Sequence, residues 1–129
     1  MEKIIIAIFA CVSTYVVCAQ DFETEFVQLQ NLFQERAGST QKQLTNYQEK
    51  YPYSTYCDEV ALMQGVLEVE REKFKQALKT LSNVNPKYLS RSSESTYYFY
   101  MGYTLLNLDQ CEQALTVLRK LKKKQNQYY

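Results

Sequence analysis

Two stretches decide the fold: residues 61–81, ALMQGVLEVEREKFKQALKTL, and residues 98–118, YFYMGYTLLNLDQCEQALTVL. Each holds a glycine, then an alanine twelve residues later, then a leucine four residues further on. The two sets are offset by 37 residues, and they are Gly65, Ala77 and Leu81, then Gly102, Ala114 and Leu118. A fixed period of this size is typical of stacked supersecondary units. The pattern therefore predicts a repeat protein, whose stacked units provide extended binding surfaces.

Small residues at fixed positions predict close packing between helices. We expect Gly65 to face Ala77 where the two antiparallel helices of a pair cross, because a larger side chain would force the helices apart. Leu81 and Leu118 are expected to fill the space toward the neighbouring helix. The alternative is a generic helical bundle in which the matched glycines and alanines are a coincidence.

Apolar residues recur at helical spacing along the chain, and no strand pattern competes with them. The expected helices cover residues 20–36, 40–50, 58–70, 74–84 and 96–108, followed by a last helix that frays after residue 121. We expect Gly38 to end the first helix, Thr40 and Asp109 to begin capping boxes, and residues 90–95 to form a serine-rich turn. The sequence thus predicts an all-α protein of about six helices, arranged as antiparallel hairpins in a solenoid.

The repeat resembles the tetratricopeptide repeat (TPR), a unit of about 34 residues that reads W-x2-L-G-x2-Y, then A-x3-F, then P. One copy here is Ala61-x2-Gln64-Gly65-x2-Glu68 with Ala77-x3-Leu81, and the next is Tyr98-x2-Met101-Gly102-x2-Leu105 with Ala114-x3-Leu118. One period before Ala77 lies Thr40, so Thr40-x3-Leu44 marks a half copy that ends at Pro52. The resemblance implies helix pairs at 57–86 and 94–124, a half or degenerate pair at 38–52, and a separate amphipathic helix at 20–37.

The chain also departs from the standard unit. Its period is about three residues longer, and the loop Tyr51-Pro52-Tyr53-Ser54 is similar to those of exported bacterial TPR proteins. That group includes the TPR lipoprotein of the outer-membrane β-barrel assembly machine and a periplasmic TPR partner of the Tol system. Gln64 and Glu68 stand where the family usually has Leu and Tyr. Since no polar capping helix follows, we expect either a truncated array or a last helix that docks on a partner or a second copy.

Composition argues against catalysis and against nucleic acid as a partner. The 129 residues carry a net charge of +1 and no histidine, the commonest general base and metal ligand. Phosphate-binding loops, nucleophile elbows and metal-ligand clusters are absent from the sequence. We expect no enzyme activity, no catalytic residues, no metal and no cofactor. Glu68, Glu70 and Glu72 are expected on solvated helix faces.

The first residues predict export. Lys3 precedes an apolar run over residues 4–17, and small residues place a signal-peptidase cut before Gln20, so residues 1–19 form the signal peptide. The alternative is lipidation at Cys18, which alone would bring the protein to a membrane. We expect a periplasmic or outer-membrane-associated protein in which Cys57 and Cys111, at opposite ends of their helices, are two unpaired, partly buried thiols.

The first helix of each pair is expected to line a concave groove, as the resemblance implies. The groove residues would be Leu62, Val66 and Val69 of one pair, and Phe99, Tyr103 and Leu106 of the next. Leu62 and Val66 replace the Lys and Asn with which some TPR domains clamp a peptide carboxylate. An apolar groove suits an apolar helix or an extended segment of a protein partner.

Other interpretations of these aromatic residues stay open. Phe22, Phe26 and Phe33 of the first helix would cover the groove, or the groove residues would belong to the core. A second function class is a glycan- or small-ligand-binding module, because tyrosine rings stack on sugars, although the chain has no tryptophan. The basic stretch 119–124 predicts either an anionic contact or simple stabilisation of a helix C-terminus.

Overall fold

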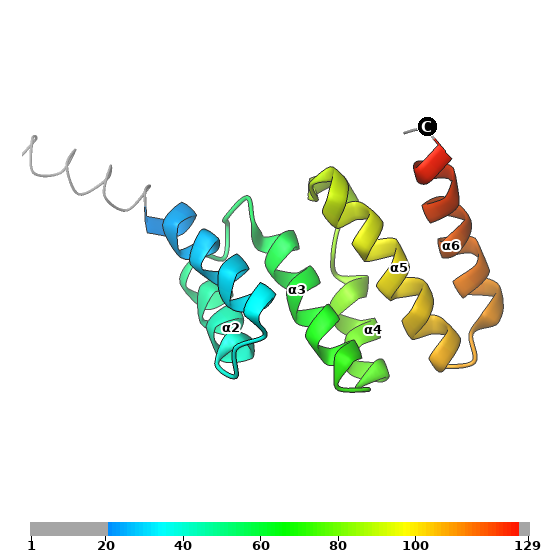
Figure 1. Cartoon of the computed structure of the whole chain (residues 1–129), viewed down its shortest axis with the longest axis horizontal. Coiled ribbons are helices and arrows are strands. Elements are labelled where there is room, and N and C mark those ends of the chain that lie inside the picture. The colour runs from blue at the N-terminus through cyan, green and yellow to red at the C-terminus, as the bar shows by residue number, and fades with distance from the viewer. Residues whose placement is uncertain (1–20, 127–129) are drawn as a thin grey trace, which may run out of the picture. The chain divides into compact units, whose positions relative to one another are not determined.

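A computed structural model describes residues 21–126, which are all-helical and contain no strand (Figure 1). The predicted signal peptide and Cys18 lie outside these residues. The helices are a segment over residues 21–35, α2 (Thr40–Lys50), α3 (Cys57–Glu70), α4 (Phe74–Ser82), α5 (Arg91–Asn107) and α6 (Cys111–Asn126), with a short 3-10 helix η1 (Pro86–Tyr88) before α5. The described chain divides between Ser54 and Thr55 into two compact units. The all-α prediction is confirmed.

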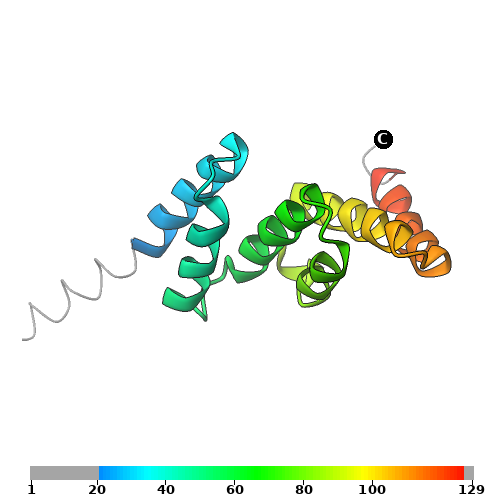
Figure 2. The ribbon, with the colours of Figure 1, turned by 90° about the horizontal axis from the view of Figure 1, so that it is seen from below.

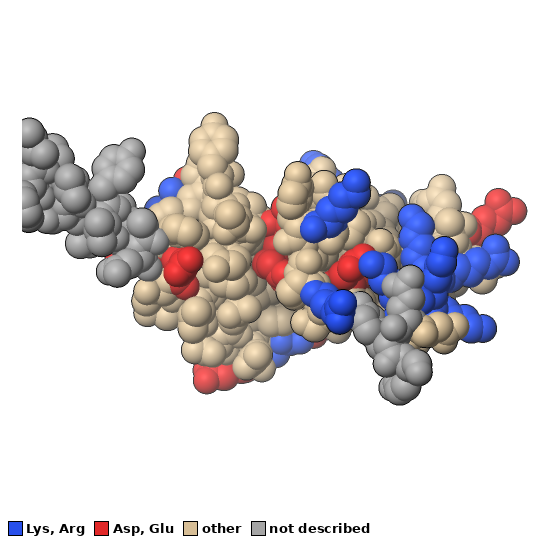
Figure 3. Space-filling view, turned by 90° about the horizontal axis from the view of Figure 1, so that it is seen from above, with Lys and Arg blue, Asp and Glu red and all other residues tan. Residues whose placement is uncertain are grey.

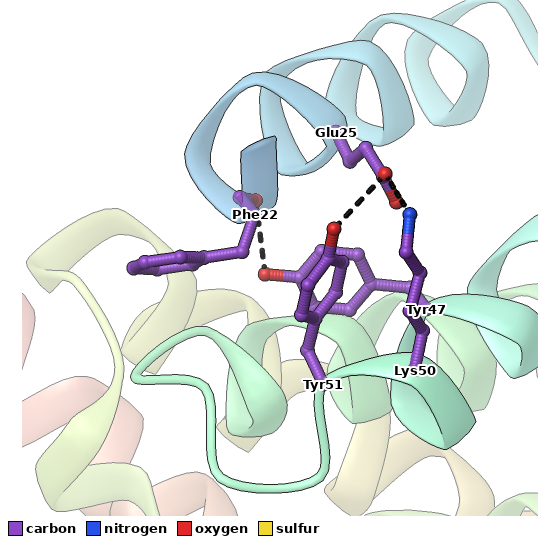
Figure 4. Close-up of polar contacts among 5 residues, drawn as sticks. All are labelled: Phe22, Glu25, Tyr47, Lys50 and Tyr51. Atoms are coloured by element: carbon purple, nitrogen blue, oxygen red, sulfur yellow. Dashed lines mark hydrogen bonds and ion pairs between the residues drawn. The ribbon is translucent and has the colours of Figure 1, made fainter. Parts of the chain in front are cut away.

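The first unit is a helical hairpin, in which residues 21–35 pack on α2. Tyr47 donates its hydroxyl hydrogen bond to the carbonyl of Phe22 at 3.2 Å (Figure 4). Glu25 pairs with Lys50 and accepts from the Tyr51 hydroxyl at 3.0 Å, so one carboxylate of the first helix holds two side chains at the end of α2. The interaction of Lys50 with Glu25, and to a smaller extent that of Lys50 with the Tyr51 hydroxyl, raises the pKa of Lys50 above its usual range. The segments that we expected as a separate helix and a half pair therefore form one hairpin.

The second unit consists of two hairpins, α3–α4 and α5–α6. Neighbouring helices run in opposite directions, and both α3 and α4 also pack on α5 (Figures 1 and 2). The buried side chains include Val60 and Val66 of α3, Leu81 of α4 and Leu105 of α5. Because α5 contacts three helices, it is the element on which this unit is organised.

Three helices end in the same left-handed turn. The residues with positive φ are Arg36 at 53°, Glu72 at 58° and Asp109 at 60°. In each turn this residue and the next donate backbone hydrogen bonds to carbonyls three and five positions back, at 2.9–3.2 Å. This is the Schellman arrangement, which satisfies the last carbonyls of a helix. The turns at Glu72 and Asp109 are 37 residues apart, which is the sequence period.

The expected cap residues act differently. Gly38 does not adopt a positive φ, because the first helix has already ended at Arg36. Thr40 is the first residue of α2, and its hydroxyl donates to the carbonyls of Ala37 at 2.7 Å and Leu32 at 3.1 Å. Asp109 terminates α5 instead of capping α6, which begins at Cys111.

The predicted serine-rich turn is wrong, since α5 already begins at Arg91. Ser90 is its N-cap, and the Ser90 hydroxyl accepts from the Ser93 amide at 3.3 Å. Serine favours this position, so the serines mark the start of a helix and not a loop. At the other end of the unit, α6 continues to Asn126 without the expected fraying after residue 121.

Candidate functional site

The repeated glycines lie directly beneath leucines. A Cβ atom built on Gly65 would be 2.5 Å from Cδ2 and 2.7 Å from Cγ of Leu81. A Cβ atom on Gly102 would be 2.6 and 2.7 Å from the same atoms of Leu118. We expected Ala77 opposite Gly65, and the three atoms nearest to the Cβ position of Gly65 all belong to Leu81. The leucine of each hairpin therefore covers the glycine of that hairpin.

The alanines of the repeat are fully buried, and so is the residue one period earlier. Ala77 and Ala114 have 0% of their surface exposed, and Thr40 has 1%. The leucines differ, because Leu44 and Leu81 are fully buried whereas Leu118 is half-buried. Only small side chains occupy the alanine position, and they all lie at the start of the second helix of a hairpin.

The six residues of the expected groove divide into two groups. Leu62, Val66 and Val69 of α3 are buried. Phe99, Tyr103 and Leu106 of α5 are exposed by 49%, 45% and 46%. The accessible part of the expected groove is therefore limited to these three residues of α5, which we call the α5 row.

The α5 row is held in place by aromatic contacts. Its residues follow one another at helical steps of four and three, so they lie on one side of α5. The rings of Phe99 and Tyr103 are parallel within 9°, with centroids 6.3 Å apart. Phe74 of α4 meets Tyr103 edge-on at 6.1 Å, and Tyr100 meets Phe99 at 5.3 Å. These contacts fix the orientation of the exposed rings.

A buried carboxylate in α3 is the polar feature that sequence reasoning missed. Glu68 is only 6% exposed, and Thr80 of α4 donates to its Oε2 at 2.8 Å. Burial raises the pKa of Glu68, while the Thr80 hydrogen bond and the charge of Lys73 act in the opposite direction. The expectation of a solvated face is thus wrong for Glu68, although Glu70 and Glu72 are exposed.

The next hairpin has an apolar pair at the equivalent positions. One period after Glu68 and Thr80 stand Leu105 and Val117. Leu105 is 4% exposed, as buried as the carboxylate that it replaces. This equivalence is a signal in the sequence that could have placed Glu68 in the helix contact. It also indicates a packing role for Glu68.

No disulfide joins Cys57 and Cys111. Cys57 is half-buried as expected, but Cys111 is exposed, so the expectation of a partly buried thiol is wrong for Cys111. Within residues 21–126 no three acidic or cysteine side chains are arranged to hold a metal ion. None of the helices in this range combines the length and the apolar character needed to cross a membrane.

Basic side chains gather over the C-terminal end of α6 (Figure 3). This helix carries Arg119, Lys120, Lys122, Lys123 and Lys124 against a single acidic residue, Glu112. Lys124 pairs with Glu94 of α5 at 2.8 Å, so part of the charge fastens α6 to its neighbour.

Comparisons with protein-family models, with characterised proteins and with solved structures find no match for this chain.

Proposed function

We propose that the chain is a non-enzymatic, TPR-like scaffold that binds a protein partner. The observation that carries this proposal is the recurrence of one contact: a leucine covers a glycine at nearly the same distances in α3–α4 and in α5–α6. The two hairpins also share a fully buried alanine and a left-handed turn with the same spacing. Proteins built of equivalent hairpins characteristically present surfaces for partners.

The α5 row is the binding surface in this proposal. Three large apolar side chains, each about half exposed, lie together on one side of a helix. Clustered exposed apolar residues are a common mark of interaction sites. Because the rings are already oriented, the side chains of the α5 row lose less conformational entropy when a partner helix or an extended apolar segment binds to them.

Export is part of the same proposal. We place the protein in the periplasm or at the outer membrane, on the strength of the apolar segment 4–17 and the expected cut before Gln20. Intact mass spectrometry of the protein from envelope fractions tests this. A mature N-terminus at residue 20 supports export, whereas retention of Met1 in the cytoplasm contradicts it. An added diacylglyceryl mass on Cys18 would identify the lipidated form.

A glycan-binding module is the second candidate function. The parallel rings of Phe99 and Tyr103 favour it, because flat exposed aromatic surfaces stack on sugar rings. The absence of tryptophan counts against it. Calorimetry with a set of oligosaccharides separates the two candidates, since a scaffold for proteins gives no saturable heat.

The binding test uses a row variant and a matched control. Phe99→Ser with Tyr103→Ser removes the exposed rings, whereas Tyr53→Ser removes a ring that is 98% exposed elsewhere. We expect the wild type and Tyr53→Ser to retain the same envelope proteins and the row variant to lose them, with circular dichroism showing equal helix content. Equal retention by all three proteins would contradict the proposal.

A further inference from the structure

A groove lies on the other side of α5 from the α5 row. It has a volume of about 400 Å3 and is bounded by α4, α5 and α6. The residues that matter here are Leu78 of α4, Tyr97, Met101 and Leu105 of α5, and Val117 and Lys120 of α6. We call it the α4–α6 groove.

The groove and the α5 row are separate surfaces. A helix turns about 100° per residue, so Tyr97, Met101 and Leu105 project about 150° away from the mean direction of the α5 row. Both surfaces therefore belong to one helix, yet a ligand in one does not touch the other. The groove can take a partner independently of the proposed function.

The floor of the groove is apolar. Tyr97, Met101 and Leu105 are each less than 10% exposed and form the bottom between the flanking helices. The α6 wall runs from Gln113 to Lys120, seven residues or about 10 Å along the helix. A partner helix that anchors residues i, i+4 and i+7 covers the same length. The groove thus has the dimensions of two turns of an amphipathic helix.

Charge selects among amphipathic helices. Lys120 is the one charged residue in the lining, and among the described residues it forms no ion pair. Arg119, Lys122 and Lys123 lie close to it along α6, while the whole chain has a net charge of only +1. A positive potential concentrated on one wall attracts a ligand with carboxylates beside its apolar face and repels a basic one.

We propose that the α4–α6 groove binds an acidic amphipathic helix of a partner protein, with apolar anchors on Tyr97, Met101 and Leu105 and a carboxylate on Lys120. The chain then joins two partners from opposite sides of α5, which is what a scaffold requires.

The test uses two synthetic helical peptides with the same leucine face. One carries glutamates on its flanks and the other carries lysines, and binding of each to the full chain is measured by fluorescence anisotropy at low salt. We expect saturable binding of the glutamate peptide and at least about fivefold weaker binding of the lysine peptide. Absence of saturable binding, or equal affinity for both peptides, overturns the proposal.

Two charge reversals on α6 locate the contact. Lys120→Glu is expected to weaken binding of the glutamate peptide by about fivefold and to strengthen binding of the lysine peptide. Lys122 projects about 160° from Lys120, so Lys122→Glu lowers the general positive potential of α6 without removing the direct contact and should change both affinities by clearly less. Equal effects of the two reversals would show general attraction to α6 and overturn the proposal.

The row variant and sedimentation separate the remaining possibilities. Phe99→Ser with Tyr103→Ser should leave peptide binding intact. Failure of the binding proposed for the α5 row can therefore be distinguished from failure of the binding proposed for the α4–α6 groove. Loss of peptide binding in this variant would place the peptide on the α5 row and overturn the proposal. If sedimentation shows a dimer that Lys120→Glu dissociates, the groove binds a second copy of this chain, and the proposal is overturned.

Discussion

Leu81 covers Gly65 so closely that a Cβ atom at position 65 would lie 2.5 Å from Leu81 Cδ2, and Leu118 covers Gly102 in the same way 37 residues later. Real Cβ atoms do not approach a neighbour to this distance, so any larger residue must displace the leucine. The contact explains why glycine stands inside α3 and α5, where it weakens a helix by about 0.5–1 kcal/mol relative to alanine.

Alanine substitutions at the three glycines should have graded effects. Gly65→Ala is expected to destabilise by about 1–3 kcal/mol, because Leu81 is fully buried and cannot move aside. Gly102→Ala should cost less, since the half-buried Leu118 can shift, whereas Gly102→Leu should cost about 1–3 kcal/mol. Gly38→Ala is the control, since nothing lies within 4 Å of its Cβ position. Urea unfolding measures all four, and equal effects at 38 and 65 would contradict the close contact.

The pair Glu68–Thr80 can be exchanged for the pair of the next hairpin. Thr80→Val should destabilise by about 1–3 kcal/mol, because the buried carboxylate loses its donor. Glu68→Leu with Thr80→Val copies Leu105 and Val117 and should be at least as stable as the wild type. Thermal melting of both variants checks this. A double variant less stable than the wild type would show that the two hairpins do not pack equivalently.

The same carboxylate predicts a pH dependence of stability. Burial raises the pKa of Glu68 in the folded state, so the folded state binds the proton more tightly than the unfolded state. Stability therefore falls as the pH rises from the unfolded pKa, about 4.3, through the higher folded value. In Glu68→Gln this fall should be reduced. An unchanged pH profile of the free energy of unfolding in that variant would contradict the raised pKa.

Glycine should be favourable in the left-handed turns. Glu72 and Asp109 have φ values of 58° and 60°, which cost a residue with a Cβ about 1–2 kcal/mol. Glu72→Gly is expected to stabilise by about 0.5–1 kcal/mol, and Asp109→Gly by less, because aspartate tolerates this conformation better. The control Lys79→Gly, on the exposed side of α4, should cost about 1 kcal/mol. If Glu72→Gly costs as much as the control, position 72 does not adopt this turn.

The all-helical class and the recurrence of the small residues could be predicted from the sequence. Gly65, Ala77 and Leu81 recur one period later, and such spacing depends only on local helix geometry and close packing. The helix ends could not be predicted in this way. Arg36 and Glu72 adopt a conformation that their residue types disfavour, because the backbone hydrogen bonds of the turn outweigh the strain. The expectation that Gly38 ends the first helix was therefore wrong, because the left-handed turn lies at Arg36.

The candidate site was predictable only in part for a related reason. Helical periodicity placed Leu62 and Phe99 on equivalent faces, and the TPR resemblance assigned both to one groove. Which of the two is accessible depends on tertiary packing, and Leu62 is 4% exposed whereas Phe99 is 49% exposed. The buried state of Glu68 is likewise set by its neighbours, since a glutamate in a charged stretch ordinarily indicates a solvated face.

A double-mutant cycle between Gly65 and Leu81 tests the repeated hairpin contact most directly. If Leu81 covers Gly65, Gly65→Ala destabilises the wild type by about 1–3 kcal/mol but is neutral or stabilising in a Leu81→Ala background, where the space is free and alanine is the better helix former. The equivalent cycle at Gly102 and Leu118 should give coupling of the same sign and smaller size. Identical costs of Gly65→Ala in both backgrounds would contradict the contact on which the proposed function rests.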